Sequence, residues 1–237
     1  MVVWTHVALS GLWGGLLALE RRAFLQAMFS RPLVAATGMG ILLDDVPSGL
    51  FVGMLLELFH LGAANLGAAL PENDTLAATC CAAASAALGS SCGGSTPALW
   101  SLSILLFVGM GRVGRTLDRA LERYSTRLLG RAVLDAEHGD LTRAVRQNLW
   151  GMWPHFVCFA LATASCAVIG YLLAPLVQRL PLNGLRGLAW AFPAMASVAA
   201  AIAARGSHAK RAALYAGTAA AVVTVLAAFA TFGRVAP

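Results

Sequence analysis

Carboxylate, amide and imidazole side chains interrupt an otherwise apolar stretch in the N-terminal half of the chain, and these residue types can bind a ligand. Glu57 stands inside an apolar run, where a charged group is costly and by default indicates function. Gly49, Gly53 and Glu57 follow at intervals of four residues along one slowly turning helix face, and the glycines would let a second helix approach closely. His60 and Asn65 extend this patch, which suits a polyhydroxylated ligand because its groups accept and donate hydrogen bonds.

Two further interpretations of Glu57 and His60 stay open from the residues alone. The two side chains could form a buried structural pair. They could also relay protons in a carrier that a pH gradient drives, because ionisable groups at membrane depth often serve as proton relays.

A second polar interruption runs from Pro71 to Thr75, between two apolar runs. This pattern predicts a turn and then a helix start, with Asn73 or Asp74 as the capping residue. The segment could serve as a cap alone, or it could be the tip of a polar hairpin that contacts a substrate.

Polar residues also punctuate the amphipathic stretch from Glu20 to Pro32, and Gln26 is the central one. This stretch could lie in the membrane interface. It could also lead into a re-entrant helix that begins at Arg31 and Pro32, because proline is favoured at the first position of a helix.

The sequence shows no sign of independent enzyme chemistry. It has no G-x-S-x-G motif, no Walker A motif and no cluster of metal ligands, so we expect neither a catalytic residue, a cofactor nor a metal ion. The five cysteines lack CxxC spacing and are interpreted as small packing residues. The net charge of +6 is interpreted as a report of membrane orientation, and no nucleic-acid partner is expected.

The composition predicts the elements that must position these residues. Apolar residues make up 59% of the chain and charged residues 12%, against about 25% charged residues in an ordinary soluble domain. The mean hydropathy is +0.73. We therefore expect an all-α polytopic membrane protein, since helices satisfy their own backbone groups in a bilayer. The candidate segments are 2–19, 32–43, 48–70, 75–88, 97–111, 149–176, 186–204 and 212–233.

Two of these segments, 32–43 and 75–88, are too short to span a bilayer, which needs about 20 residues. Short or interrupted apolar segments are typical of re-entrant or broken helices near a transporter's binding site. The alternative is a short helix that is buried among others.

The polar stretch 112–148 is predicted to form an amphipathic helix pair on the cytoplasmic side. Its arginines recur every four residues from Arg115 to Arg131, and Asp118 and Glu122 are expected to temper their charge. The predicted organisation is a membrane half at 1–111, the helix pair at 112–148 and a second membrane half at 149–237. The charge distribution predicts that residues 177–185 and the C-terminus lie on the far side of the membrane.

Residues 30–77, SRPLVAATGMGILLDDVPSGLFVGMLLELFHLGAANLGAALPENDTLA, resemble the signature region of one family. This family is the IIC membrane subunit of the mannose/fructose/sorbose phosphotransferase system. The matching positions are Arg31-Pro32, Leu43-Asp44-Asp45, Gly49 to Gly53, Leu56-Glu57, Gly67-Ala68 and Pro71 to Ala77. The sequence departs from the family pattern at Asp44, where the family usually has glycine, at Glu72-Asn73, and at His60.

The resemblance implies a sugar permease subunit of the bacterial inner membrane. Such a subunit pairs with a IID membrane subunit and works with soluble IIA and IIB, and the assembly is a hetero-oligomer that could have a homo-oligomeric core. IIB phosphorylates the hexose, and IIC carries no phosphorylation site. The residues expected to bind the sugar are Glu57, Asn65, Asn73, Asp74 and Gln26, with Asp45 shaping the site. The competing hypothesis is a non-transporting membrane scaffold or sensor in a phosphotransferase relay.

Overall fold

The computed structural model describes residues 2–23, 25–61, 71–206, 217–219 and 222, and the regular structure within these ranges is helical. This finding confirms the predicted all-α membrane fold. The helices are α1 (Val2–Arg22), α2 (Pro32–Leu42), α3 (Val46–Leu61), α4 (Asp74–Cys92), α5 (Pro97–Phe107), α6 (Met110–Glu137), α7 (Leu141–Val177) and α8 (Leu182–Gly206). The described part has five helical stretches that are long and apolar enough to cross a membrane, with α5 and α6 taken together as one of them.

α2, the short apolar helix predicted at 32–43, forms a hairpin with α3. The predicted segment 48–70 is described only as far as Leu61. The two helices touch through glycine: a Cβ on Gly40 would lie 3.0 Å from the Cα of Gly49. A Cβ on Gly53 would lie 3.0 Å from the carbonyl oxygen of Leu33. The small residues therefore bring the two backbones together, which is how helices pack closely inside membranes.

The turn between α2 and α3 accounts for Asp44. Asp44 has a φ of 55°, in the left-handed region where glycine is favoured and where aspartate is tolerated better than most residues. The N–H of Asp45 donates to the carbonyl of Gly40 at 2.8 Å, and the N–H of Asp44 donates to the carbonyl of Ile41 at 3.4 Å. This pair of bonds ends α2 in a Schellman motif. Asp44 is exposed, so it closes the helix through its backbone.

α4 is a full-length helix at the centre of the bundle, and the prediction of a short segment at 75–88 was wrong. It begins at the capping residue Asn73 and ends at Gly93, whose φ of 84° is left-handed. Alanine, serine and cysteine dominate its sequence, and nearly all of its side chains are buried by α2, α3, α5 and α7. Because these side chains are small, neighbouring helices can surround α4 on every side.

α1 crosses α7 at a contact made of glycines. A Cβ on Gly11 would lie 3.2 Å from the carbonyl oxygen of Ala160, and one on Gly15 would lie 2.7 Å from the ring of Phe156. The contact lies on the apolar half of α7. The other half of α7 is polar and corresponds to the predicted second helix of the 112–148 pair. The predicted segment 149–176 continues from it without a break, so both belong to one helix.

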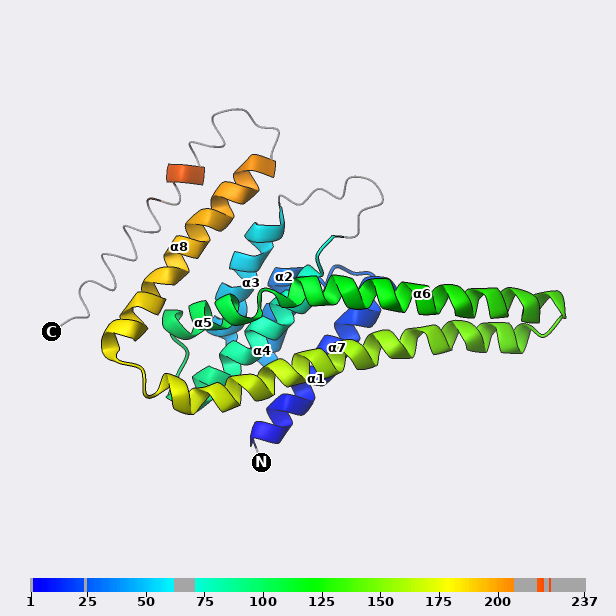
Figure 1. Cartoon of the computed structure of the whole chain (residues 1–237), viewed down its shortest axis with the longest axis horizontal. Helices are drawn as coiled ribbons and strands as arrows, with labels where there is room; N and C mark the ends of the chain where they lie inside the picture. Colours follow the sequence, from blue (N-terminus) through cyan, green and yellow to red (C-terminus); the bar gives the residue numbers. More distant parts are fainter. Residues whose placement is uncertain (1, 24, 62–70, 207–216, 220–221, 223–237) are drawn as a thin grey trace.

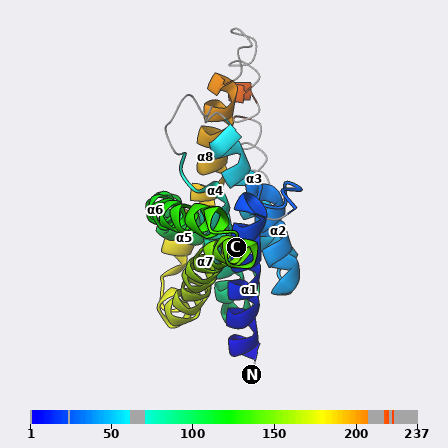
Figure 2. The same ribbon diagram turned by 90° about the vertical axis from the view of Figure 1, so that its right-hand side faces the viewer.

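α6 and the first part of α7 lie side by side and extend away from the other helices, as predicted for a helix pair (Figure 1). Figure 2 looks along this projection, which we call the arm and define as residues 119–148. Residues 178–181 join α7 to α8 at the end of α7 that is remote from the arm (Figure 1). The division into domains at 111 and 148 remains a prediction.

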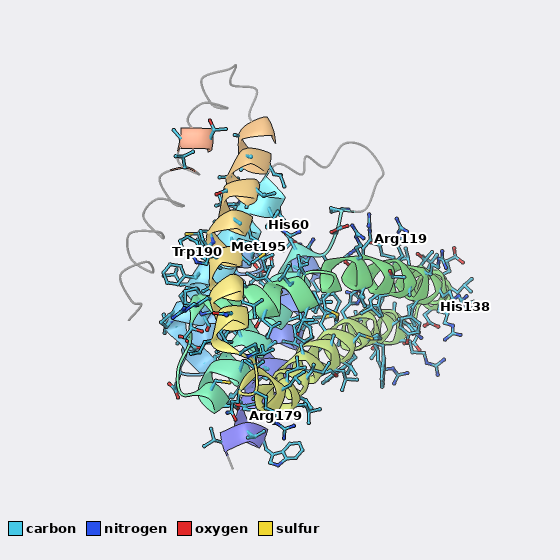
Figure 3. All side chains as sticks on the ribbon, turned by 60° about the vertical axis from the view of Figure 1, so that its left-hand side comes forward. His60, Arg119, His138, Arg179, Trp190 and Met195 are labelled. Atoms are coloured by element: carbon cyan, nitrogen blue, oxygen red, sulfur yellow. The ribbon has the colours of Figure 1, made fainter. Side chains whose placement is uncertain are left out.

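The acidic residues of α6 do not temper its arginines as expected. Asp118 and Glu122 turn instead to Arg22 of α1, whose guanidinium lies 3.3 Å and 2.6 Å from their carboxylates. Arg119, Arg123, Arg127 and Arg131 are exposed and make no ion pair within the described residues. Figure 3 shows Arg119 on the side of α6 that faces away from α7.

α8 packs against α3 and α5 through an aromatic cluster. The rings of Phe51 and Trp100 stack with centroids 4.5 Å apart, and Phe192 meets Trp100 edge-on at 5.3 Å. The predicted segment 186–204 lies within α8. The last predicted segment, 212–233, lies outside the described residues except at 217–219 and 222.

Candidate functional site

Glu57 closes the open end of the α2–α3 hairpin. Its Oε1 lies 3.2 Å from Nε of Arg31, and its Oε2 accepts the backbone N–H of Leu33 at 3.2 Å. The carboxylate therefore binds the first turn of α2, where unpaired N–H groups favour a negative charge. The side chain of Glu57 is 16% exposed and that of Arg31 is 55% exposed, so the pair borders the surface.

His60 does not form the structural pair with Glu57 that the sequence left open. Its Nδ1 lies 2.8 Å from the carbonyl oxygen of Leu56 in its own helix, while Glu57 contacts Arg31. Figure 3 shows His60 near the end of α3. Pro32 begins α2, and Gly49 and Gly53 face α2 as the face pattern predicted. Asn65 and Gly67 lie outside the described residues.

Asn73 sits at the junction of α4 and α6 and is completely buried. Its Oδ1 accepts the N–H of Leu76 at 2.9 Å and so caps α4, while its Nδ2 donates to Asp118 at 2.8 Å. Its own N–H donates to the carbonyl of Gly111 at 2.9 Å. Asp118 is 2% exposed, and its Oδ1 has no hydrogen-bond partner within the described residues. Asn73 therefore does more than cap a helix, because it also pairs a buried carboxylate.

Replacing Asn73 with aspartate separates these two roles. The variant keeps a capping oxygen but places a second carboxylate against Asp118, so we expect it to be destabilised at least as much as Asn73→Ala. A lost cap costs about 1 kcal/mol and a lost hydrogen bond to a buried charge about 1.5–3 kcal/mol, which together predict a loss of roughly 2–4 kcal/mol. Thermal unfolding of the detergent-purified chain measures the difference. Asn183→Ala, at an exposed position of α8, is the matched control. Wild-type stability of Asn73→Asp would show that the cap alone matters.

Asp74 and the residue after it connect α4 to α1. The carboxylate of Asp74 forms an ion pair with Arg21, and the same guanidinium donates to the hydroxyl of Thr75 at 2.7 Å. The hydroxyl of Thr75 in turn donates to the carbonyl of Ser30. Both side chains of the Arg21–Asp74 pair are about a quarter exposed, so this pair also reaches the surface.

The loop before α2 is held by a carboxylate and carries Gln26. Glu20 is 6% exposed and accepts the N–H groups of Phe29 and Ser30 at 3.2 Å and 2.9 Å. Gln26 has a φ of 48° and an exposed side chain. The loop therefore presents Gln26 outward, on the side of the molecule that holds the hairpin opening.

Asp45 lies at the opposite end of the hairpin from Glu57. Its carboxylate accepts the N–H of Ser48 at 3.2 Å and the hydroxyl of Ser48 at 2.6 Å, which caps α3. A helix of 11 residues is about 16 Å long, so Asp45 and Glu57 are separated by roughly the length of α2. A Cβ on Gly89 of α4 would lie 2.8 Å from Oδ2 of Asp45, so the turn of the hairpin touches the end of α4.

The structure therefore gathers most of the predicted residues at one end of the bundle and leaves Asp45 at the other. Sequence reasoning missed the residues that connect them. Glu20, Arg21, Arg22 and Asp118 stand on α1 and α6, far apart in the chain, and no local pattern links them. The only sequence signal for Glu20, Arg21 and Arg22 is their placement together at the end of an apolar helix.

These features define a multi-pass membrane protein with a polar site at the opening of a hairpin of short helices, which is the architecture of a membrane transport subunit. The sequence profile of the sorbose-specific IIC component of the phosphotransferase system matches residues 4–216. The chain belongs to this family, as its signature region predicted.

Individual relatives match the chain over a shorter region. Over 49 residues it is 45% identical to the mannose-specific EIIC component of Escherichia coli (strain K12) and to the sorbose-specific EIIC component of Lacticaseibacillus casei. Each match covers 21% of this chain and 18% of the relative.

Two solved structures share the fold over nearly the whole chain. One is described as the structure of a membrane protein and superposes with a TM-score of 0.66. The other is a cryo-EM structure of the mannose transporter ManYZ with microcin E492, with a TM-score of 0.56. Both are 22% identical to this chain, and each match covers 99% of this chain and 92% of the neighbour.

Proposed function

We propose that the chain is the sugar-translocating IIC subunit of a mannose-type phosphotransferase system in a bacterial inner membrane. The observation that carries the proposal is the partly exposed carboxylate of Glu57 at the opening of the α2–α3 hairpin, within a chain of the IIC family. A carboxylate beside a guanidinium offers both acceptors and donors to neighbouring sugar hydroxyls. The relatives named above act on mannose and sorbose, and a hexose is the proposed cargo.

The proposed roles of the site residues follow from their exposure. Glu57, Asp74 and Gln26 reach the surface and would contact the sugar, together with Asn65. Asn73 is fully buried, so it would act by fixing the start of α4. Asp45 would shape the far end of the hairpin, where it caps α3.

The proposed partners are a IID membrane subunit and soluble IIA and IIB, with IIB supplying the phosphoryl group on the cytoplasmic side. The ManYZ structure, whose fold this chain shares, favours pairing with a second membrane subunit. The exposed arginines of α6 form a cationic surface on the arm. We propose this surface as a contact site for these partners, because the charges of its arginines are not neutralised within the described residues.

A non-transporting scaffold or sensor is the second candidate. It is favoured by the fact that the described carboxylates of the site already bond within the chain: Glu57 to Arg31, Asp74 to Arg21 and Asp45 to Ser48. A sugar would have to replace or extend these bonds.

Membrane vesicles decide between the candidates. We expect vesicles that contain this chain and IID to accumulate labelled mannose or sorbose as the sugar phosphate. The vesicles are loaded with IIA, IIB, phosphoenolpyruvate and the general phosphocarrier proteins that pass its phosphoryl group to IIA. Vesicles without the phosphoryl donor but with a pH gradient should accumulate neither sugar. Uptake driven by the gradient alone would identify a proton-coupled carrier, and no uptake with the complete set would favour the scaffold.

A further inference from the structure

A cavity of about 350 Å³ lies at the root of the arm, between the end of α1 and the facing sides of α6 and α7. Its volume is within the range of small-molecule sites in proteins. None of the residues proposed above to bind sugar lines this cavity. It is therefore a second candidate binding site at the same end of the bundle, separate from the α2–α3 hairpin.

The lining of the cavity includes polar groups that the fold leaves unused. The hydroxyl of Ser125 and the side-chain amides of Gln147 and Asn148 line the cavity, and within the described residues these groups make no hydrogen bond. His155 lies deeper and is 8% exposed, with its Nδ1 3.1 Å from the carbonyl of Gly151. Ser125 and Gln147 are half-buried and Asn148 is exposed, so these groups are available to donate and accept hydrogen bonds with a ligand.

The charges around the cavity favour a neutral ligand. Its one arginine, Arg22, is already paired with Glu122 at 2.6 Å and with Asp118 at 3.3 Å. The guanidinium is therefore already neutralised by two carboxylates, and the lining offers no unpaired positive charge to an anionic ligand. The side chain of Glu122 is 41% exposed, so its carboxylate remains available to accept hydrogen bonds.

The rest of the lining is apolar and includes Leu128 and Met152. A cavity whose lining combines amides, a hydroxyl and a carboxylate with aliphatic groups matches a molecule with hydroxyl edges and C–H faces. We propose that this cavity binds a neutral polyhydroxylated molecule, such as a free hexose, at the end of the bundle where the arm begins. The choice of a hexose as the probe rests on the proposed function.

The test is equilibrium dialysis of radiolabelled mannose, fructose and sorbose against the purified full-length chain. The variant Gln147→Leu/Asn148→Leu removes two free amides, and we expect at least a tenfold loss of affinity at this site. Asn183→Leu replaces a single amide with leucine at an exposed position of α8 and should bind as the wild type does. The double variant is also compared in the Glu57→Ala background, which lacks the proposed sugar ligand of the hairpin, so that the remaining binding reports the cavity, which Glu57 does not line.

A second measurement locates the ligand. In the variant Ser125→Cys, the bound sugar should slow alkylation of the new thiol, as resolved by mass spectrometry. Wild-type affinity of the double variant would overturn the proposal, as would failure of all three sugars to bind the wild type. Tighter binding of glucose 6-phosphate than of the free sugars would also overturn it, because the cavity would then select an anion.

These results are separable from a test of the proposed function. Donor-dependent uptake with unaltered sugar binding in the double variant would reject the cavity and keep the transport assignment. Binding at the cavity without any uptake would reject the transport assignment and keep the cavity.

Discussion

Replacing Glu57 with alanine is expected to reduce donor-dependent sugar uptake to background while the protein still inserts in the membrane. The change removes the acceptor that holds Arg31 and the first turn of α2, and it removes the proposed sugar ligand. Glu57→Gln keeps an oxygen that can accept from Leu33 but lacks the charge, so we expect intermediate uptake. Uptake of labelled mannose or sorbose, normalised to the amount of protein in the membrane, measures both effects.

Glu72→Gln is the matched control for the loss of an ion pair at this end of the bundle. Glu72 pairs with Arg112 and Arg115 outside the hairpin, and its side chain is 37% exposed. Exposed ion pairs contribute about 0–1 kcal/mol, so this variant should transport normally. Wild-type uptake by Glu57→Ala at an equal amount of membrane protein would contradict the assignment of Glu57.

Gly49→Ala is expected to destabilise the packed contact between α2 and α3 strongly. A Cβ at this position would collide with the carbonyl oxygen of Ala36 and lie 2.9 Å from the Cα of Gly40. Both neighbours are backbone atoms in the facing helix, so the hairpin can accept the methyl group only by separating α2 from α3. Forcing extra atoms into a packed contact typically costs about 1–3 kcal/mol, and the rigidity of the backbone predicts the upper end of that range.

The control is the same substitution at Gly130 in α6, where an added Cβ would meet no atom within 4 Å. Alanine favours a helix over glycine by about 0.5–1 kcal/mol, so Gly130→Ala should stabilise the protein slightly. The midpoint of thermal unfolding in detergent should therefore fall for one variant and rise for the other. Equal midpoints would show that α2 and α3 separate without cost.

Local patterns predicted the helices well, and tertiary contacts account for the differences. The apolar run, the proline at its start and the polar turn at its end identified α2 to within one residue. The start of α4 was predicted with Asn73 or Asp74 as its cap, but its full length was hidden because alanine and serine look too weakly apolar for a central membrane helix. Burial on all sides favours these small residues, and burial is a property of the whole bundle.

In the candidate site, too, local patterns identified single residues, while their partners depended on tertiary contacts. Glu57 was identifiable because a carboxylate in an apolar run stands out, and its grouping with the glycines followed from helix periodicity. Its partner Arg31 was predicted only as the start of a helix, without its charge being linked to Glu57. The pairing of Arg22 with Asp118 joins residues 96 positions apart, so only the folded chain brings them together. Asp44 became intelligible once its φ of 55° was known, because that backbone conformation explains why glycine is usual there.

The continuity of α7 makes it a mechanical link between the arm and the membrane part. Its 37 residues span about 55 Å. Near its middle, α7 packs closely against the glycines of α1, so it can tilt about this contact. A partner that pulls the arm must either bend the helix at Pro154, where a backbone hydrogen bond is missing, or tilt its apolar half against α1. A force on the arm would thus change the tilt of the apolar half of α7.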